Sequence, residues 1–584
     1  MNYLINQNIS KKTNKNFLKA SLKIRSKIKK FINKPSIKMA DKKLIYINEI
    51  YGWRKVSNKK ETLWIKGIIY NYTDTYILNR LSKVKSNYIK FFLNSIDGHF
   101  AIIYEKKNII ISVVDQLGSI PIFYYFNKNS FLVTPFPSKI NNKFKKEINN
   151  DQVLSLSMSS YTTGVSTIYK NLYSLKAGTF LIFNKKNKLL TKKVFYDYKN
   201  WKIDNNSNFK KKQLQLSKLH IKIINKIYKY SLEKKKKIAI PLSAGYDSRL
   251  IASCLKELGA KNVFCFSYGY KNNYEARAAE KISKKLGYRW EFVDLTNNKI
   301  FNLFKNYKFK KFRSIFDTFF CVSDLTEFYA IKELSERKKL LNTIIINGNS
   351  GDFITGDHII DYKISSNPKK TVDNLLSVFI NKHYKLWKSL FVGKNINIIK
   401  KLLLQEIKNI SILKKIDKNN SHSLFEYLEY YNRQSKHLSS KQRVYEYFNC
   451  EWSLPLWDKD YIEFWRTIKK EFKVNQKLYA ETITNNNFGD VWKSKKWRIL
   501  KYKAKTPTFL IGYIIRPFFK FVFITKGRLA WYDFEKRYIA YYTDILCSMG
   551  IKKYFNLIRD KRGYRNFLAL HTEDYLTKKK IKII

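Results

Sequence analysis

The central part of the chain alternates short apolar runs with segments whose apolar residues recur at helical spacing. Residues 237–242, 262–268 and 290–294 are apolar runs of strand length, and residues 248–258 and 275–286 between them have the period of amphipathic helices. Strands that alternate with helices in this way are typical of a parallel, doubly wound sheet, whose ligand site lies at the carboxyl ends of the strands. The pattern therefore predicts an α/β domain with a site just after residue 242.

The segment that follows the first strand has small residues where a bound phosphate would approach the backbone. It reads Ser243-Ala-Gly-Tyr-Asp-Ser248 and leads into a helix, whose first N–H groups and dipole favour an anion. Asp247 offers a hard oxygen for Mg²⁺, and the serine hydroxyls can hydrogen-bond phosphate oxygens. Taken alone, the segment is also explained as an ordinary strand-turn-helix capped by Asp247 and Ser248.

This loop resembles the S-G-G-x-D-S loop of the N-type ATP pyrophosphatases, and its Leu-Ser-x-Gly-x-Asp-Ser-Arg form is most similar to the asparagine synthetase branch. A second loop, residues 348–356, follows the apolar strand that begins at Thr343 and resembles the family's G-E-G-x-D-E-x-x-G-G loop. The resemblance implies that Asp352 is a second magnesium ligand.

The second loop also departs from the family pattern. Asn349 stands where the family has a glutamate assigned to proton handling, Ser350 replaces a glycine and Phe353 replaces the second acid. These changes do not alter the metal-binding role that the resemblance implies for Asp352. The identity of the catalytic base stays open.

Two further segments extend the resemblance. Residues 432–458 resemble the family segment R…G-x-E-x-R-x-P-F-L-D on the acyl-acceptor side of the site, with Pro455 and Asp458 matching directly. Lys477-Leu-Tyr479 resembles the family's K-x-L-x-R stretch. The family's later catalytic lysine has no clear counterpart among Lys495, Lys496, Lys503 and Lys505.

The resemblance thus implies ATP and Mg²⁺ as cofactors and a defined set of site residues. The implied catalytic residues are Asp247, Asp352 and Lys477, and the implied metal ligands are Asp247 and Asp352. The implied nucleotide contacts are Leu242, Ser243, Ala244, Gly245, Tyr246, Asp247, Ser248, Phe266, Gly348, Asn349 and Gly351.

The amino-terminal half resembles a class-II glutamine amidotransferase domain, which implies an α+β fold of layered β-sheets. The similar strands are Trp64–Tyr72, Asp97–Ile102 and Val114–Tyr125. Such domains attack glutamine with an N-terminal cysteine, whereas this chain begins Met1-Asn2 and its first cysteine is Cys254. Lys66, Ile68 and Val114 replace the family's asparagine, glutamate and arginine. We therefore expect glutaminase activity to be lost.

Length and cysteine use fit a two-domain intracellular protein. We expect a basic arm over residues 1–45, the amidotransferase-like domain over 46–205, the ATP-binding domain over 206–485 and a helical extension over 486–584. The five cysteines form no C-x-x-C pair and no metal-binding spacing, so the reducing cytoplasm is the expected compartment.

The net charge of +69 would normally favour nucleic acid or anionic lipid. The charge is spread along a chain rich in Lys, Asn, Ile, Tyr and Phe, residues with A/T-rich codons, so we do not expect a nucleic-acid partner. Residues 506–524 are the most apolar segment, interrupted by Arg516, Pro517 and Lys520. A packed helix pair and peripheral contact with the inner face of an anionic membrane both explain this segment.

These features together predict an ATP-dependent ligase. A substrate carboxylate would attack ATP to give an acyl-adenylate and pyrophosphate, and an amine would then displace AMP to leave an amide. The nitrogen would come from free ammonia, a separate amidotransferase or another amine, and the carboxylate from a small molecule or a surface-glycan precursor. The alternatives are an RNA-modifying ATP pyrophosphatase and a non-catalytic relative of the family.

Overall fold

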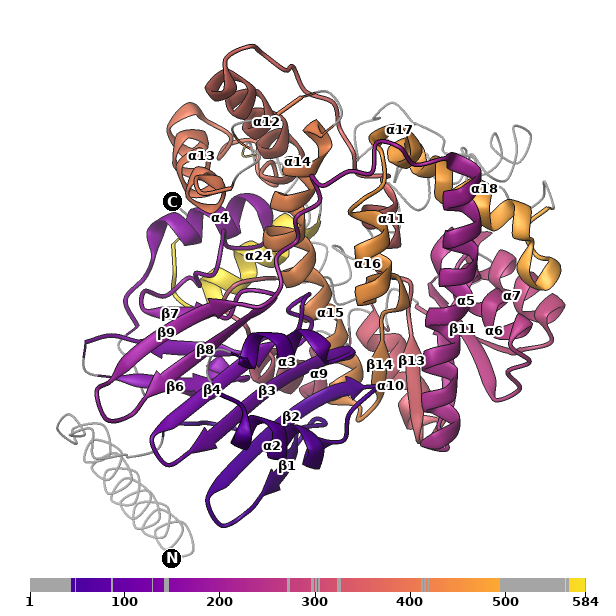
Figure 1. Cartoon of the computed structure of the whole chain (residues 1–584), viewed down its shortest axis with the longest axis horizontal. Coiled ribbons are helices and arrows are strands. Elements are labelled where there is room, and N and C mark those ends of the chain that lie inside the picture. The colour runs from indigo at the N-terminus through magenta and orange to yellow at the C-terminus, as the bar shows by residue number, and fades with distance from the viewer. Residues whose placement is uncertain are drawn as a thin grey trace, which may run out of the picture. The chain divides into compact units, whose positions relative to one another are not determined.

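Two antiparallel sheets and one parallel sheet form the framework of the part of the chain that the structure describes (Figure 1). The computed structural model describes residue 562, residues 567–582 and residues 44–493, the last with gaps at 48, 86–87, 129, 141–145, 270–273, 296–298, 300–301, 303–304, 323–326, 411–412, 414–415 and 418–419. Almost all of the predicted basic arm, the apolar segment 506–524 and the lysines at 495, 496, 503 and 505 lie outside the described residues.

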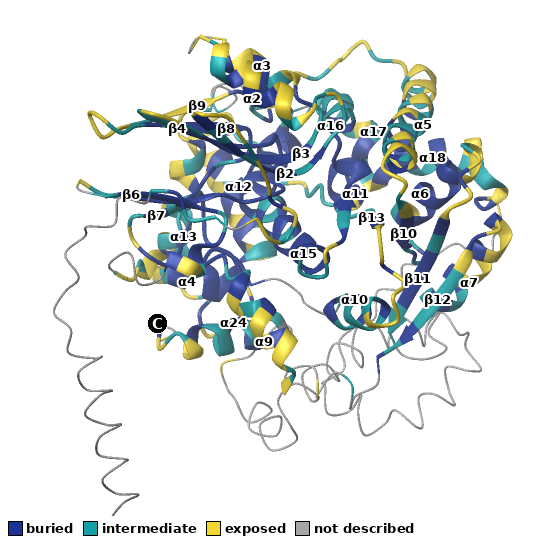
Figure 2. Ribbon diagram, turned by 90° about the horizontal axis from the view of Figure 1, so that it is seen from below, coloured by how far each residue is buried: buried dark blue, intermediate teal, exposed yellow. Residues whose placement is uncertain are grey.

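The first half of the chain is a two-layered β-sheet domain, as predicted. The larger sheet has the order β1 (Arg54–Ser57), β2 (Glu61–Ile69), β3 (Gly98–Lys106), β4 (Ile109–Val114), β8 (Thr179–Asn184) and β9 (Leu189–Val194). The smaller sheet has the order β6 (Phe131–Thr134), β5 (Phe123–Phe126) and β7 (Leu172–Ser174). Buried residues fill the space between the layers (Figure 2). Phe131 stacks on Phe183 there, with ring centroids 4.0 Å apart.

The second half contains the predicted parallel sheet. Its order is β12 (Arg289–Asp294), β11 (Val263–Gly269), β10 (Lys237–Pro241), β13 (Thr343–Ile346) and β14 (Glu451–Ser453). The chain runs outward from β10 through β11 to β12 and then returns to place β13 on the other side of β10. This reversal makes the carboxyl end of β10 a topological switch point, where open α/β sheets bind ligands.

Helices lie around the parallel sheet and continue into a helical region. The helices of the first group are α5 (Phe209–Glu233), α6 (Tyr246–Glu257), α7 (Tyr274–Leu286), α9 (Tyr307–Ile315), α10 (Glu327–Glu336) and α11 (Gly351–Thr355). Those of the second group are α12 (Pro368–His383), α13 (Gly393–Ile407), α14 (Ser421–Glu429), α15 (Ser435–Tyr447), α16 (Lys459–Trp465), α17 (Lys470–Lys473) and α18 (Lys477–Asn486). Among the described residues, no helix is long and apolar enough to span a bilayer.

The described residues of the carboxyl-terminal extension are 486–493, 562 and 567–582, and the last range contains helix α24 (Phe567–Lys578). It packs against α4 (Asn150–Ser159) of the amidotransferase-like domain. Tyr575 donates a hydrogen bond of 2.8 Å to Asp317, and Lys579 pairs with the same carboxylate. The described part of the extension therefore contacts both domains, the first through α4 and the second through Asp317.

A buried ion pair joins the two domains. The Nζ of Lys66 in β2 lies 2.5 Å from Oε2 of Glu446 in α15, and both side chains are at most 4% exposed. Arg443 completes the cluster, because its guanidinium lies 2.7 Å from Oε1 of Glu446 and donates to the carbonyl of Ser119 at 3.0 Å. Burial lowers the pKa of Lys66 to about 8, although Glu446 opposes the shift. The residue that replaces the family's asparagine is thus a cation fixed to the other domain.

We expect Lys66→Met to lower the free energy of unfolding by about 3 kcal/mol, because the buried Glu446 carboxylate would lose one of its cationic partners. Lys55→Met provides the control, since Lys55 is exposed on the neighbouring strand β1. Its effect should stay within about 0.5 kcal/mol. Denaturant unfolding of both variants measures the difference, and equal midpoints would contradict a stabilising role for the buried pair.

Candidate functional site

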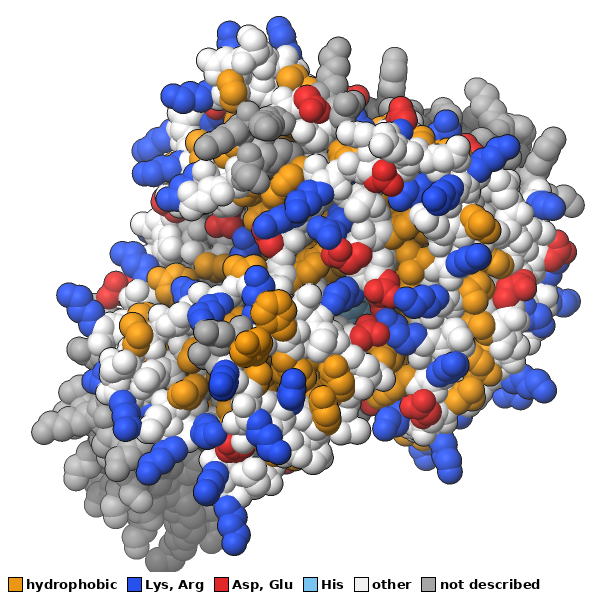
Figure 3. Space-filling model, in the orientation of Figure 1, with side chains coloured by type: hydrophobic (Ala, Val, Ile, Leu, Met, Phe, Trp, Pro, Cys, Tyr) orange, Lys and Arg blue, Asp and Glu red, His pale blue; other side chains and the backbone are white. Residues whose placement is uncertain are grey.

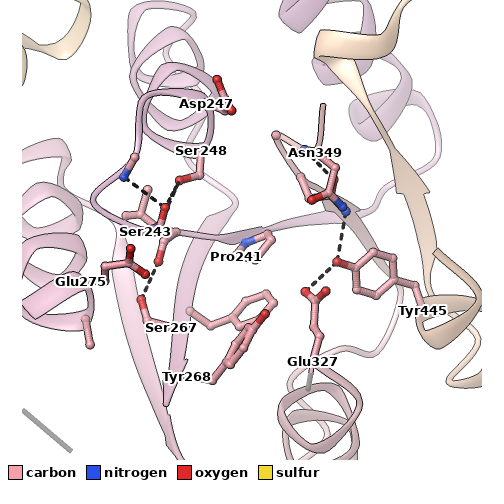
Figure 4. Close-up of a pocket in the computed structure, with 16 residues that line it drawn as sticks. Pro241, Ser243, Asp247, Ser248, Ser267, Tyr268, Glu275, Glu327, Asn349 and Tyr445 are labelled. Carbon is pink, nitrogen blue, oxygen red and sulfur yellow. Dashed lines mark hydrogen bonds between the residues drawn. The ribbon is translucent and has the colours of Figure 1, made fainter. Parts of the chain in front are cut away.

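A cavity of about 310 Å³ lies at the carboxyl ends of β10, β11 and β13 (Figure 4). Its position is the one predicted from the alternating strands and helices. The predicted nucleotide contacts that line it are Leu242, Ser243, Gly245, Asp247, Ser248, Phe266, Gly348 and Asn349. Ala244, Tyr246 and Gly351 belong to the same two loops without lining the cavity.

The first loop is curled by hydrogen bonds among its own residues. The N–H of Ser243 donates to Oγ of Ser248 at 3.0 Å, and the N–H of Gly245 donates to Oγ of Ser243 at 3.1 Å. The guanidinium of Arg249 donates to the carbonyl of Ala244 behind the loop. Gly245 caps α6 without a side chain, so the positive end of the helix dipole faces the cavity at Ser243 and Ser248. This geometry is suited to an anion.

The second loop lies directly against Asp247. A Cβ atom at Gly348 would come within 2.5 Å of the Asp247 Cβ, and a Cβ atom at Gly351 would overlap the Asp247 carboxyl group. Ser350 takes the left-handed conformation, with φ of 67°, that suits the family's glycine, and its hydroxyl donates to Oε1 of Gln434 at 2.6 Å. The glycine at position 351, which the family pattern leaves free, is therefore required here by the close approach of the loops.

Asp247 and Asp352 bring two carboxylates together. Burial and then the negative charge of Asp352 raise the pKa of Asp247 to about 8. Tyr479 of α18 donates to Oδ1 of Asp247 at 2.9 Å. Among the described residues, no cluster of three or more His, Cys, Asp or Glu side chains has metal-binding geometry. Mg²⁺ is commonly held by one or two carboxylates plus substrate phosphates, so this pair of hard oxygen donors fits that ion.

Asp352 is held in turn by a histidine that sequence reasoning missed. Nε2 of His358 lies 3.2 Å from Oδ2 of Asp352, and its Nδ1 lies 2.6 Å from Oε1 of Glu429, which is completely buried. Burial opposes a charge on His358, but Glu429 and Asp352 outweigh it and raise its pKa to about 9. Partial desolvation opposes the shift, but the hydrogen bond and charge of His358 lower the pKa of Asp352, whose side chain is 52% exposed. The sequence did offer a signal for His358: it is one of only seven histidines in the chain, and it lies just after the glycine-rich loop 348–356.

Two residues of the family-like segments do not join this cluster. Lys477 is exposed and its Nζ lies over the ring of Phe209, 5.3 Å from the centroid, so the implied catalytic lysine does not line the cavity. Tyr479, two residues after Lys477 in α18, reaches Asp247 instead. Asp458 caps α16 and pairs with Lys226 at 2.5 Å, which gives it a structural role.

A second polar group faces the cavity from the side of α15. The hydroxyl of Tyr445 donates to Oε1 of Glu327 at 2.7 Å and accepts from Nδ2 of Asn347 at 3.1 Å. Oδ1 of Asn347 accepts from the N–H of Asn349 at 3.1 Å. Glu327, Tyr445 and Asn347 all line the cavity, and none was a candidate from sequence.

Comparisons with known proteins agree with this two-domain organisation. Residues 224–485 match the asparagine synthase family, and residues 33–196 match the glutamine amidotransferase domain. The "Putative asparagine synthetase 2 (glutamine-hydrolyzing)" of Methanocaldococcus jannaschii is 25% identical over 337 residues, which cover 55% of this chain and 59% of that protein. The chain thus matches about three fifths of the length of this curated relative.

Two solved structures of other proteins match parts of this chain at low similarity. The NH3-dependent NAD synthetase from Campylobacter jejuni is 17% identical, with a TM-score of 0.20, and the match covers 37% of this chain and 91% of that one. A glutamine phosphoribosylpyrophosphate amidotransferase from B. subtilis is 12% identical, with a TM-score of 0.18, and the match covers 41% and 72%. Both TM-scores are low, so the assignment rests on the matched sequence ranges.

We expect Gly351→Ala to weaken the binding of ATP with Mg²⁺ by more than about tenfold, because the added methyl group would push the second loop away from Asp247. Gly393→Ala is the matched control, since a Cβ atom there would meet no neighbour within 4 Å. Isothermal titration calorimetry measures both affinities. Unchanged affinity in the Gly351 variant would show that the contact between the loops is not needed for the site.

Proposed function

This chain belongs to the asparagine synthetase family and carries an amidotransferase-like domain before its synthetase domain, and from this premise we propose that it is an ATP-dependent ligase that forms an amide from a carboxylate. The observation that carries the proposal is that the anion-binding loop and Asp247 line one cavity, while the second loop lies against Asp247 and the charge of Asp352 acts on it.

Each part of the site has a place in this reaction. The start of α6 and the hydroxyls of Ser243 and Ser248 bind the phosphates of ATP. Asp247 and Asp352 would hold Mg²⁺, which neutralises the charge that develops on the departing pyrophosphate. The substrate carboxylate attacks the α-phosphate to give an acyl-adenylate, and an amine then displaces AMP.

The carboxylate substrate is an amino acid, a peptide or a uronic acid of a surface-glycan precursor in this proposal. RNA is not a substrate in this proposal. Lys and Arg side chains are scattered over the face in Figure 3 and mixed there with acidic and apolar side chains. A non-catalytic relative is the second candidate, favoured by Asn349 at the position of the family's glutamate.

We expect the purified protein with Mg²⁺, ATP and a library of carboxylates to release pyrophosphate and AMP. Asp247→Ala should reduce this release at least about 100-fold, because the leaving pyrophosphate would lose its charge stabilisation. A coupled pyrophosphate assay and chromatography of the nucleotides measure both products. Release of ADP and phosphate would exclude the acyl-adenylate route, and no turnover with any carboxylate would favour the non-catalytic relative.

The amidotransferase-like domain supports a nitrogen source other than glutamine hydrolysis on this chain. Lys66 is paired with Glu446, while Ile68 and Val114 have no polar group to hold glutamine. The described cysteines are buried, and burial raises the pKa of Cys265, Cys321 and Cys450 to about 12 and that of Cys254 well above its ordinary value. Thiols in such surroundings are poor nucleophiles. Free ammonia, a separate amidotransferase or another amine supplies the nitrogen in this proposal.

We expect incubation with glutamine alone to yield no glutamate above the rate of the buffer, because the described residues place no thiolate for attack on the side-chain amide. An enzyme-coupled glutamate assay checks this result. In parallel, ammonium chloride should support turnover where glutamine does not. Glutamate release by the full chain would overturn the proposed loss of glutaminase activity.

A further inference from the structure

The cavity contains a tyrosine–glutamate pair on the side away from the phosphate-binding loop. Figure 4 places Glu327 with Tyr445 and Asn349 on one side, and Glu275 beside Ser267 and Ser243 on the other. Glu327 begins α10, and its Oε1 accepts the hydroxyl proton of Tyr445 in a hydrogen bond of 2.7 Å. The pair lines the same cavity as Asp247 and Asn349.

We propose that Glu327, oriented by Tyr445, is the base that takes the proton from the attacking amine in the amide-forming step. This inference rests on the proposed ligase function. It assigns to Glu327 the proton-accepting role for which Asn349 is unsuited, because a neutral amide cannot accept a proton at neutral pH.

The other carboxylates of the described cavity lining are less suited to this role. Asp247 lies against the second loop and Asp352, where a metal ion would occupy it. Glu275 lies on the phosphate-loop side, away from Asn349 (Figure 4). Glu327 is instead connected to Asn349 through Tyr445 and Asn347 by successive hydrogen bonds of 2.7, 3.1 and 3.1 Å.

The hydrogen bond from Tyr445 orients the Glu327 carboxylate. Burial and the nearby charge of Glu327 raise the pKa of Tyr445 well above its ordinary value. The phenol therefore stays protonated and donates a hydrogen bond to the carboxylate. Neighbouring Glu446 is fixed by Lys66 and Arg443, and Gln442 accepts from Asn347 at 2.9 Å. Helix α15 is therefore anchored at residues before and after Tyr445, which gives the preorganisation that a catalytic pair requires.

The step balances with the groups present. The nitrogen lone pair of the amine forms a bond to the acyl carbon of the adenylate, and the bond from that carbon to the phosphate oxygen breaks. AMP leaves with the electron pair of that bond. One N–H proton passes to the Glu327 carboxylate, either directly or by way of the Tyr445 hydroxyl, which gives its own proton to Glu327. Glu327 then releases the proton to solvent.

The test separates adenylation from amide formation in the full-length chain. With Mg²⁺, ATP and the most active carboxylate of the library, exchange of labelled pyrophosphate into ATP reports adenylation, and ammonium chloride supports amide formation. Glu327→Gln should keep exchange near the wild-type rate and slow amide formation at neutral pH by about 100-fold or more. At a constant concentration of unprotonated ammonia, its remaining rate should rise with pH, because hydroxide replaces the missing base.

Two further variants refine the assignment. Tyr445→Phe keeps the ring but removes the hydroxyl that orients Glu327, and it should slow amide formation by about tenfold without changing exchange. Glu336→Gln removes the same charge from the exposed end of the same helix and should change neither rate.

The possible results lead to different conclusions. Wild-type amide formation by Glu327→Gln, or an equal loss of exchange and amide formation, would overturn the assignment of Glu327. Absence of exchange in the wild-type protein with every carboxylate would instead contradict the proposed ligase function.

Discussion

The close approach of two loops at Asp247 is the constraint on which the site depends. The loops come from different strands on either side of the switch point, and they touch because Gly348 and Gly351 have no side chains. This contact brings Asp352 near Asp247, and burial together with that second negative charge disfavours ionisation of Asp247. The protein stabilises the arrangement with the Tyr479 hydroxyl on one carboxylate and a protonated His358 on the other. Such a carboxylate pair is costly without a cation and favourable with one.

The amidotransferase-like domain has layered sheets, and one of its strands contacts the helix beside the cavity. Strand β2 places Lys66 against Glu446, next to the tyrosine that lines the cavity. A buried ion pair contributes little net stability when it is compared with an apolar contact, but it fixes one relative placement of the groups that it joins. The first domain thus contacts α15 through this pair, next to the cavity.

Several buried charged residues lie in helix α15 and the segment before it. Glu429, Glu446 and Lys436 are all buried there, and burial lowers the pKa of Lys436 to about 7. A π-helical turn, Tyr430–Gln434, separates α14 from α15, and such turns often occur at functional sites. These buried charges need fixed partners, so the helical region is specified by polar contacts as well as by packing.

The local pattern of the sequence determined the parts of this protein that depend on neighbouring residues. The alternation of strands and helices predicted the parallel sheet, and the small residues of 243–248 predicted an anion-binding turn after β10, because both features follow from the spacing of a few adjacent side chains. The layered fold of the first domain was implied by the resemblance of short segments to a class-II glutamine amidotransferase domain. Only the tertiary structure decided which distant residues meet: Tyr479 with Asp247, His358 with Glu429, Glu327 with Tyr445, and Lys66 with Glu446. It also placed Lys477 outside the cavity. Contacts across tens to hundreds of residues depend on how helices and sheets pack, and no periodicity within the chain records that packing.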